Sequence, residues 1–374
     1  MGRGYAQGER IGWAVPGSRV WSPGDWLPAH AGVMTGQRFP LASELLDLQY
    51  GVISRGQALE CGISQDAIRV RLRNGRWQRL AAGVYATFSG EPPRLALFWA
   101  ALLTAGPGAA ISHQTAAELY QLGRRPAQAI HVTIPGERQV RRGAGVGPRA
   151  RDTTRTGRPF TDQDVPRLIV HRSAWLARAR HPVLLPPRTR IEETVADLTQ
   201  CAATFDEAFG WISQACGSRL CTPSQIRVAL ERRKKLRHRA ELLGALSDVR
   251  EGVLSPLEYR YVHGVERPHG LPAARRQVMV TLDGRRRYLD NLYQDYLLVV
   301  ELDGAAAHPV AERWRDIHRD NSLQVLELRT LRYGWSDVTG RRCDTAAQVA
   351  AILTQRGWPG PVRRCSRGCP VLPP

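Results

Sequence analysis

Acidic residues surround a short apolar run near residue 300. Residues 297–300 are Leu, Leu, Val and Val, a run typical of a buried central strand, and Glu301 and Asp303 come directly after it. A further acid, Asp290, lies in the strand-like segment before the run. Carboxylate oxygens suit Mg²⁺ and Mn²⁺, and Mg²⁺ commonly uses one or two carboxylates together with substrate phosphate. The sequence therefore predicts a divalent-metal site with Asp290 and Glu301 as metal ligands.

The turn between the two strand segments brings these acids together. A turn centred on residues 295 and 296 places Asp290 directly opposite Glu301, with Cβ atoms roughly 5 Å apart. Asp303 is two residues beyond Glu301 and therefore points to the same face. Like charges in these positions destabilise a strand pair, so they favour a bound cation. The competing interpretation is that the acids are solvated strand ends and that Asp303-Gly304 is an ordinary turn signal.

A series of short elements must position these acids. A helix is expected to begin at Ser255, where Ser255, Pro256 and Glu258 fit an N-cap, a first-turn proline and a capping-box acid. Glu258 is therefore either a capping residue or a further acid of the site. The elements expected next are strands at residues 277–282, 287–292 and 297–302, a helix at 310–324, a strand at 327–333 and a helix at 345–355. This αβββαβ(α) order, with acids on the second and third strands, is that of a restriction-endonuclease core.

The composition indicates a negatively charged partner. The chain has 374 residues, enough for two or three domains, and a formal net charge of +19 with a pI near 10.6. Lysine occurs only at Lys234 and Lys235, so nearly all the basic charge is arginine, which binds phosphate through paired hydrogen bonds and reads guanine. Double-stranded DNA is the simplest partner, although a GC-rich coding sequence enriches arginine equally well.

The cysteines and the apolar runs bear on metal binding and location. The seven cysteines form no C-x-x-C pair, and Cys365 and Cys369 stand by themselves in a tail rich in proline and arginine. We therefore expect no zinc site, and the odd cysteine count suits a reducing cytoplasm. No run approaches about 18 apolar residues, so neither a transmembrane helix nor a membrane partner is expected.

Near the N-terminus, one expected helix carries a row of arginines. Helices are expected to begin at Ser54 and Ser64, and two short β segments follow around Gly83. This order is typical of a winged helix-turn-helix, whose third helix enters a major groove. The alternative is a small helical bundle with a solvated basic face. In the third helix Ile68 and Leu72 face inward, and the predicted DNA-binding residues are Arg69, Arg71, Arg73 and Arg76.

This segment resembles the N-terminal winged-helix domain of the abortive-infection type IV antitoxins, the AbiEi family. The likeness covers roughly residues 41–90 and is carried by the turn Gly62-Ile63-Ser64 and by the wing at residues 75–85. The resemblance implies a domain that binds the promoter of its own operon.

The whole chain is expected to be an α+β multidomain protein. The sequence of the middle region, residues 91–250, shows no pattern of residues that indicates a chemical activity, and His113 is interpreted as a structural histidine. The expected divisions are a disordered N-terminal extension (1–40), the winged helix-turn-helix (41–90), a helical α+β connector (91–250), the restriction-endonuclease-like αβββαβ core (251–358) and a disordered tail (359–374).

The C-terminal region resembles a small PD-(D/E)XK-type domain found in many bacterial proteins and related to the very-short-patch mismatch repair endonucleases. The likeness covers about residues 250–357 and is carried by YLDNLYQDYLLVVELDGAAAH and RDIHRDNSLQVLELRTLRYGWSDV. The resemblance implies motif acids at Asp290 and Glu301, a helix acid at Glu258, and further polar site positions at His308, Arg319 and Asp320.

The chain departs from the family pattern at the position of a catalytic lysine. Asp303 stands where the pattern usually has lysine, and the domain contains no lysine. His308 or a nearby arginine is the expected substitute, since the mismatch-repair branch uses a histidine in such a role, whereas arginine is never a base near neutral pH. With Mg²⁺ or Mn²⁺ as the expected cofactor, the predicted catalytic residues are Asp290, Glu301, Asp303, Glu258 and His308.

Three functions are consistent with the sequence. The first is a DNA endonuclease or nickase that depends on Mg²⁺ or Mn²⁺ and is targeted by its winged helix. The second is an antitoxin-type transcriptional regulator whose nuclease-like domain is catalytically inactive. In the third, the connector and the C-terminal domain bind and neutralise a cognate toxin protein.

Overall fold

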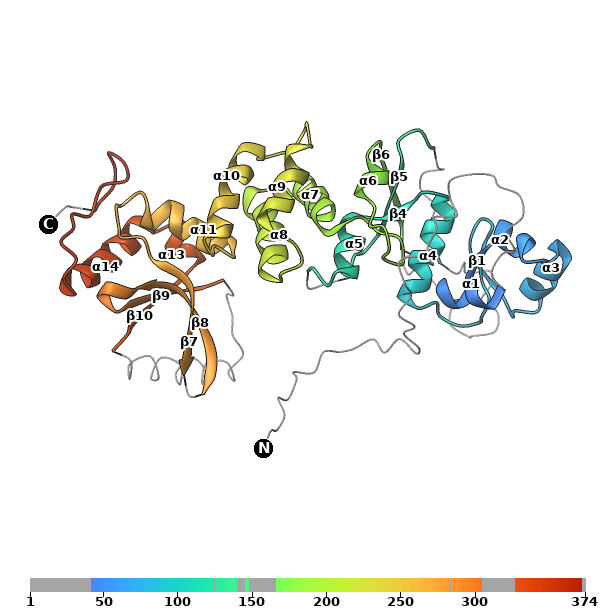
Figure 1. The fold of residues 1–374 in the computed structure, drawn as a ribbon, viewed down its shortest axis with the longest axis horizontal. Coiled ribbons are helices and arrows are strands. Elements are labelled where there is room, and N and C mark those ends of the chain that lie inside the picture. Colours follow the sequence, from blue (N-terminus) through green and yellow to red (C-terminus); the bar gives the residue numbers. More distant parts are fainter. Residues whose placement is uncertain are drawn as a thin grey trace.

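A computed structural model describes residues 42–123, 126–139, 145–147, 166–282, 284–304 and 327–371. An N-terminal, a middle and a C-terminal unit follow one another along the long axis of the molecule in chain order (Figure 1). The described part combines helices with three small sheets, in agreement with the expected α+β class. The extension expected to be disordered, residues 1–40, lies outside the described residues. No helix within the described ranges is long and apolar enough to cross a membrane.

The N-terminal unit is built on a three-stranded antiparallel sheet in the order β1-β3-β2. As the sequence predicts, Ser54 and Ser64 are N-caps, and their side chains accept hydrogen bonds from the backbone N–H groups of Gln57 and Ala67. Gly83, at φ +71°, allows the tight turn between β2 and β3. The elements are α1 (Ala42–Leu48), β1 (Val52–Ser54), α2 (Arg55–Glu60), α3 (Gln65–Arg73), β2 (Gln78–Ala81) and β3 (Val84–Ala86).

Helix α3 is fixed to this sheet by its apolar side. Ile68 is 3% exposed and packs with Trp77 and Tyr85, and Leu72 lies partly buried beside them. Full burial of a large apolar side chain stabilises the fold by about 1.5–3 kcal/mol. These contacts set the rotation of α3 about its own axis and turn its opposite side to solvent.

The core of the N-terminal unit extends past the boundary expected at residue 90. Alternate residues of β1 and β3 point to opposite faces of the sheet, and Val52 and Val84 point away from α3. On that second face they pack with Phe98 and Trp99 of α4 (Arg94–Ala105). A division at residue 90 therefore cuts through one continuous apolar core, because α4 covers the face that α3 leaves open.

The middle unit combines a small sheet with a group of helices. The sheet has the order β4-β5-β6, in which β5 and β6 are parallel. Phe209, Ile212 and Leu230 are central to the helical core. Beyond α4 the elements are β4 (Ala110–Ile111), α5 (His113–Leu119), β5 (Ile130–Pro135), β6 (Leu168–Ser173), α6 (Leu176–Ala179), α7 (Ile191–Cys201), α8 (Phe205–Gly217), α9 (Pro223–Glu231) and α10 (Arg239–Arg250).

The C-terminal unit is built on a four-stranded sheet in the order β10-β9-β8-β7. Within the described part of this sheet, β10 pairs with β9 in parallel, and the other two pairs are antiparallel. The helix expected at residues 310–324 lies outside the described residues. The elements are α11 (Pro256–Tyr261), the π-helical turn η2 (Val262–Glu266), β7 (Arg275–Leu282), β8 (Arg285–Tyr293), the 3₁₀ turn η3 (Gln294–Tyr296), β9 (Leu298–Asp303), β10 (Arg329–Gly334), α13 (Trp335–Thr339) and α14 (Arg342–Gln355).

Strands β8 and β9 pair in the register that the sequence predicts. Asn291 pairs with Val300 and Tyr293 with Leu298, across the turn η3. The recorded pairing ends at Asn291 and Val300, so Asp290 and Glu301, the next pair in the expected register, come directly after its last step. Fully buried apolar residues on both faces of β9 fix the register, because a slip by one residue would exchange the two faces.

The C-terminal segment is ordered as far as residue 371, which corrects the disorder expected for residues 359–374. Val362 and Val371 are 8% and 4% exposed and pack in the same core as Leu353 of α14. The backbone N–H of Arg363 donates to the carbonyl oxygen of His269 at 2.7 Å. A composition rich in proline and arginine suggests disorder, but a few apolar side chains and backbone hydrogen bonds suffice to fix this segment.

A buried ion pair joins η2 to β7. The side chains of Glu266 and Arg276 are only 3% and 7% exposed, and Glu266 Oε1 lies 2.5 Å from Arg276 Nη2. The other carboxylate oxygen of Glu266 accepts a hydrogen bond from the backbone N–H of Ala274 at 3.2 Å. This pair fixes the entry of the chain into β7.

Glu266→Gln is expected to lower the free energy of unfolding of the C-terminal unit by about 3–5 kcal/mol, because it leaves Arg276 buried without a counter-charge. The double replacement Glu266→Leu, Arg276→Met should lose much less, because it removes both charges together. Denaturant unfolding of the three proteins at one pH measures the difference. Equal losses in the single and the double variant would contradict a stabilising role for charge pairing here.

Candidate active site

Glu258 lies in the first turn of α11, where it completes the helix cap. Its backbone N–H donates to Ser255 Oγ at 3.1 Å, and the Ser255 hydroxyl donates to Glu258 Oε1 at 3.0 Å. The second oxygen, Oε2, accepts from the backbone N–H of Leu254 at 2.9 Å. These contacts confirm the capping role that the sequence suggests for Glu258. They do not exclude a second role, since the side chain lies inside the domain and is 7% exposed.

The Glu258 carboxyl also lies within electrostatic reach of Asp290. Burial raises the pKa of Glu258 to about 7, and the negative charge of Asp290 acts in the same direction, against hydrogen bonds from Leu254, Ser255 and Gln277. A carboxyl that titrates near neutral pH can accept or release a proton under ordinary conditions. Beside a bound cation the same group would be ionised.

Gln277 of β7 connects Glu258 to Asp290, and the sequence analysis did not identify it. Its side-chain amide donates to Asp290 Oδ1 at 3.4 Å and also hydrogen-bonds Glu258. Its backbone has φ +50°, in the left-handed region, where a residue other than glycine is strained by about 1–3 kcal/mol. Strained residues of this kind concentrate at functional sites. A single glutamine near a strand start has no sequence signature, so only the fold reveals it.

Asp290 and Glu301 lie next to each other where the pairing of β8 with β9 ends. Asp290 Oδ2 accepts a hydrogen bond from the backbone N–H of Leu302 at 2.9 Å, so its carboxylate lies against β9 directly after Glu301. Glu301 is 2% exposed, and Asp290 is half-buried. The structure therefore brings the carboxyl groups of Glu258 and Asp290 within electrostatic reach of each other, and it places the Asp290 carboxylate against the backbone of β9 directly after Glu301.

Asp303 has a different neighbour from the one expected. Its Oδ2 lies 3.3 Å from Nη1 of Arg332 on β10, and 42% of its side chain is exposed. Arg332 also stands opposite Glu301 in the parallel pairing of β9 with β10. Asp303 is thus an ion-pair partner of Arg332, and its predicted catalytic role stays a prediction. Arg332, which was not predicted, brings a guanidinium to this edge of the sheet.

Three of the predicted site positions, His308, Arg319 and Asp320, lie outside the described residues. Carboxylate oxygens from Asp290 and Glu301 are suitable donors for Mg²⁺ or Mn²⁺, which complete their shells with water and phosphate. Within the described ranges, however, two compact groups of possible metal ligands occur. One consists of three histidines, the other of one histidine and three cysteines, and neither contains an acid. The carboxylate oxygens of Asp290 and Glu301 therefore suit Mg²⁺ or Mn²⁺ chemically, but the described residues form no compact group of carboxylates that would specify such an ion.

The arginines predicted to bind DNA occupy two environments. Arg69, Arg73 and Arg76 are exposed, and Arg69 forms a solvent-exposed ion pair with Asp66 at 2.9 Å. Arg71 is partly buried, and its guanidinium carbon lies 5.4 Å from the centre of the Trp77 ring, a cation–π contact. Arg71 thus helps to hold α3 on the core, and the other three arginines form the solvent-facing set.

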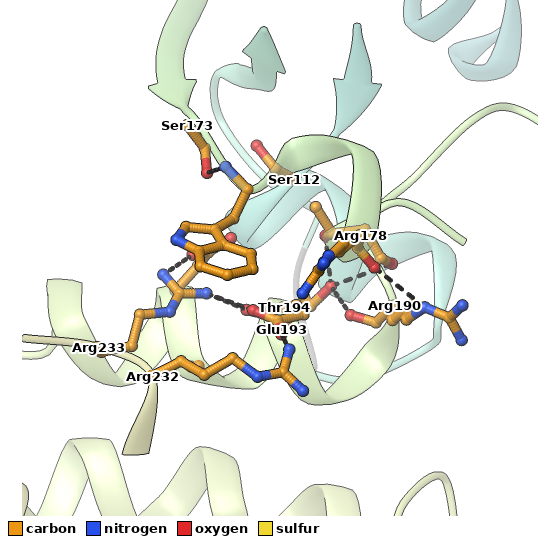
Figure 2. Close-up of polar contacts among 12 residues, drawn as sticks. Ser112, Ser173, Arg178, Arg190, Glu193, Thr194, Arg232 and Arg233 are labelled. Atoms are coloured by element: carbon orange, nitrogen blue, oxygen red, sulfur yellow. Dashed lines mark hydrogen bonds and ion pairs between the residues drawn. The ribbon is translucent and has the colours of Figure 1, made fainter. Parts of the chain in front are cut away.

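The middle unit contains a cavity of about 350 Å³, in a region where the sequence suggests no chemistry. Figure 2 shows Arg232 and Arg233, which follow α9, reaching Glu193 of α7, and each guanidinium lies 2.9 Å from one Glu193 oxygen. Arg233 Nη1 also lies 2.5 Å from Asp197 Oδ1. The charges in this wall of the cavity therefore compensate one another and hold α7 against the end of α9.

A group of three histidines lies beside this cavity. His113 stacks on His171 with ring centres 3.6 Å apart, and His131 Nδ1 lies 3.0 Å from His171 Nε2. Burial lowers the pKa of His113 to about 2 and that of His131 to about 4, and the other histidines of the group add to both shifts. His113 is therefore a neutral buried imidazole, as a structural histidine should be, although its stacking partners were not foreseen.

Comparisons of the chain with protein-family models and with curated proteins returned no match. The two family resemblances therefore stand as expectations drawn from the residues.

Glu258→Gln is expected to change how stability depends on pH. The folded state holds the Glu258 proton up to pH about 7, against 4.5 for an unperturbed group, so the protein loses stability as the pH rises between these values. The loss is up to about 3 kcal/mol and should be missing in the glutamine variant, which stays neutral. Denaturant unfolding in a chelator between pH 4.5 and 8 measures it. Asp295→Asn, an exposed acid of the same unit, is the control. Parallel curves for wild type and Glu258→Gln would mean that Glu258 ionises normally.

Proposed function

We propose that this protein is a metal-dependent DNA endonuclease or nickase that a winged helix-turn-helix brings to its substrate. The observation that carries the proposal is the buried Glu258 carboxyl within electrostatic reach of Asp290, whose carboxylate binds the backbone N–H of Leu302, directly after Glu301 at the end of an apolar central strand. Carboxylate oxygens are the donors that Mg²⁺ and Mn²⁺ prefer, and such an ion would offset the mutual repulsion of neighbouring acids.

The topology of the C-terminal unit supports the proposal. A helix with a buried acid precedes three antiparallel strands, and a fourth strand, β10, pairs in parallel with β9. With the helix expected at residues 310–324, this is the αβββαβ order of a restriction-endonuclease core. The acids stand on its second and third strands, where such cores carry their metal ligands.

Each residue of the site has a role in phosphodiester cleavage. Asp290 and Glu301 would hold Mg²⁺ or Mn²⁺, which when bound activates water and stabilises charge on the phosphate. Glu258, with a pKa of about 7, can accept a proton near neutral pH. Gln277 keeps Glu258 and Asp290 together through its hydrogen bonds. Arg332 offers a guanidinium that can bind a phosphate oxygen at the same edge.

The N-terminal unit supports DNA binding. Its order, α1-β1-α2-α3-β2-β3 with a β2–β3 hairpin, is that of a winged helix-turn-helix. On α3 and the turn after it, Arg69, Arg73 and Arg76 are exposed. Arginines on the solvent side of the helix that enters a major groove contact phosphates and base edges. We therefore assign this surface to duplex DNA.

One observation favours a second function, that of an antitoxin-type regulator whose nuclease-like unit is inactive. Asp303 stands at the expected lysine position, and its carboxylate holds Arg332 in an ion pair. A guanidinium held in this way can bind phosphate but cannot act as a base. In this alternative the protein would keep Asp290 and Glu301 but would not cleave DNA, and its activity would be DNA binding by α3.

The double variant Arg69→Ala, Arg73→Ala is expected to weaken duplex binding and to reduce the slope of log affinity against log salt by about 2, because two phosphate contacts are lost. Lys234→Ala, Lys235→Ala removes the same charge from an exposed site elsewhere and is the matched control. Fluorescence anisotropy with a labelled duplex at several salt concentrations measures both quantities. Equal affinity and slope in the two double variants would refute the assignment of α3 to DNA.

Asp290→Asn is expected to reduce the nicking of supercoiled DNA in Mg²⁺ or Mn²⁺ to the level seen in a chelator, because a metal-ligand oxygen is lost. Duplex affinity through α3 should stay unchanged. Asp295→Asn, an exposed acid in the turn beside the site, is the control and should nick like wild type. Agarose electrophoresis of the plasmid forms gives the rates. Duplex binding without nicking by the wild-type protein in either metal would contradict the endonuclease and leave the regulator.

A further inference from the structure

Four potential zinc ligands from distant parts of the chain meet beside the C-terminal core. They are His269, in the segment between η2 and β7, Cys343, in the first turn of α14, and Cys365 and Cys369, in the C-terminal segment. Their ligand atoms all lie within 4.8 Å of one another. Two of them, His269 and Cys369, are 0% and 1% exposed. This group shares no residue with the acid site, so the inference does not depend on the proposed cleavage.

The distances within the group match the edges of a zinc tetrahedron. Cys343 Sγ lies 3.6 Å from Cys365 Sγ, and Cys369 Sγ lies 3.7 Å from His269 Nε2. With Zn–S bonds of about 2.3 Å and Zn–N bonds of about 2.0–2.1 Å, a regular tetrahedron has S–S edges of about 3.8 Å and S–N edges of about 3.6 Å. The spacing C-x₃-C between Cys365 and Cys369 is also one that zinc sites use.

The surroundings orient two of the donors, His269 and Cys369, for a metal. His269 Nδ1 lies 2.8 Å from the carbonyl oxygen of Val265. The N–H is therefore on Nδ1, which leaves the lone pair of Nε2 directed toward Cys369, the arrangement usual for a metal-binding histidine. Cys369 Sγ accepts hydrogen bonds from the backbone N–H groups of Cys365 and Val371.

We propose that His269, Cys343, Cys365 and Cys369 bind a structural zinc ion. Three thiolates and one imidazole make a closed Cys₃His shell with no position for water or substrate, which is the pattern of structural sites. Each thiol loses its proton when it binds the ion. The proposal departs from the expectation that the cysteines bind no zinc, which considered the Cys365, Cys369 pair without its distant partners.

The ion would connect three segments of the C-terminal unit, namely the chain between η2 and β7, the start of α14 and the C-terminal segment. The C-terminal segment contributes only a few buried apolar side chains, among them Val362 and Val371. A zinc ion would tie this segment to α14 and to the chain that leads into β7. Closing loops in this way restricts the unfolded state, so the ion would stabilise the C-terminal unit in addition to its own bond energy.

A disulfide is the competing explanation for sulfur atoms this close. It would join two of the three cysteines and would leave the third, together with the oriented imidazole, without a function. All seven cysteines are free in the structure. Counting thiols in the unfolded protein separates the two explanations directly, since zinc ligands remain thiols and a disulfide removes two of them.

The test uses the full-length protein purified without chelator or added metal. Elemental analysis by mass spectrometry after gel filtration should find one zinc per chain, and thiol titration in denaturant with chelator should find seven thiols. Cys369→Ser and Cys343→Ser should each reduce zinc at least tenfold. Cys201→Ser, which alters an exposed cysteine outside the group, is the matched control and should retain the full zinc content.

Cobalt exchange keeps the test decisive if the cysteine variants fold poorly. Wild-type protein refolded with Co²⁺ should show the thiolate-to-cobalt charge-transfer band and the strong visible bands of a tetrahedral site. Adding zinc should abolish them. A disulfide mapped by peptide mass spectrometry to two of Cys343, Cys365 and Cys369, or seven thiols with neither bound zinc nor tetrahedral cobalt bands, would overturn the proposal. Zinc retained in full by both Cys369→Ser and Cys343→Ser would overturn it as well, because the ion would then lie elsewhere.

Discussion

Compensation of buried carboxyl groups is the constraint that organises the C-terminal unit. Glu258 and Glu266 are both almost completely buried in the same small domain, and neither could remain there as an isolated charge. Glu266 has a guanidinium, Arg276, and its environment is therefore complete in the folded chain. Burial raises the pKa of Glu258, and the negative charge of Asp290 adds to that shift. Within the described part of the chain, Glu266 forms an ion pair, whereas Glu258 forms hydrogen bonds and has an acid beside it, and that difference separates a structural acid from a candidate site acid.

The features that the sequence predicts depend on local rules. Ser54 and Ser64 begin helices because a short hydroxyl side chain satisfies a free backbone N–H, a rule that involves residues three positions apart. The register of β8 with β9 follows from a tight turn between two apolar segments, so the neighbourhood of Asp290 and Glu301 could be derived without a structure. The arginine face of α3 likewise follows from the helical period and the inward positions of Ile68 and Leu72.

The features that the sequence does not predict depend on contacts between distant segments. Arg332 meets Asp303 only because β10 pairs in parallel with β9, across a connection whose path no local pattern defines. Gln277 becomes part of the acid site through its left-handed backbone, which no strand propensity would suggest. His269 and Cys369 are 100 residues apart, so a search for short metal-binding motifs finds neither. Tertiary contacts of this kind also order the C-terminal segment despite its composition.

The chain entering β7 joins the acid site to the proposed zinc site. It runs from His269 through Ala274 and Arg276, both held by Glu266, to Gln277. With His269 bound to an ion, this segment would be fixed at its start by the metal and near its end by the buried ion pair. Gln277 comes directly after that ion pair and holds its strained backbone only while the residues before it stay in place. A shift at His269 would therefore act on the hydrogen bonds from Gln277 to Glu258 and Asp290, through the covalent chain and without any contact between the two sites. In this arrangement a closed structural ion far from the acids can determine how well they are positioned, although it takes part in none of their chemistry.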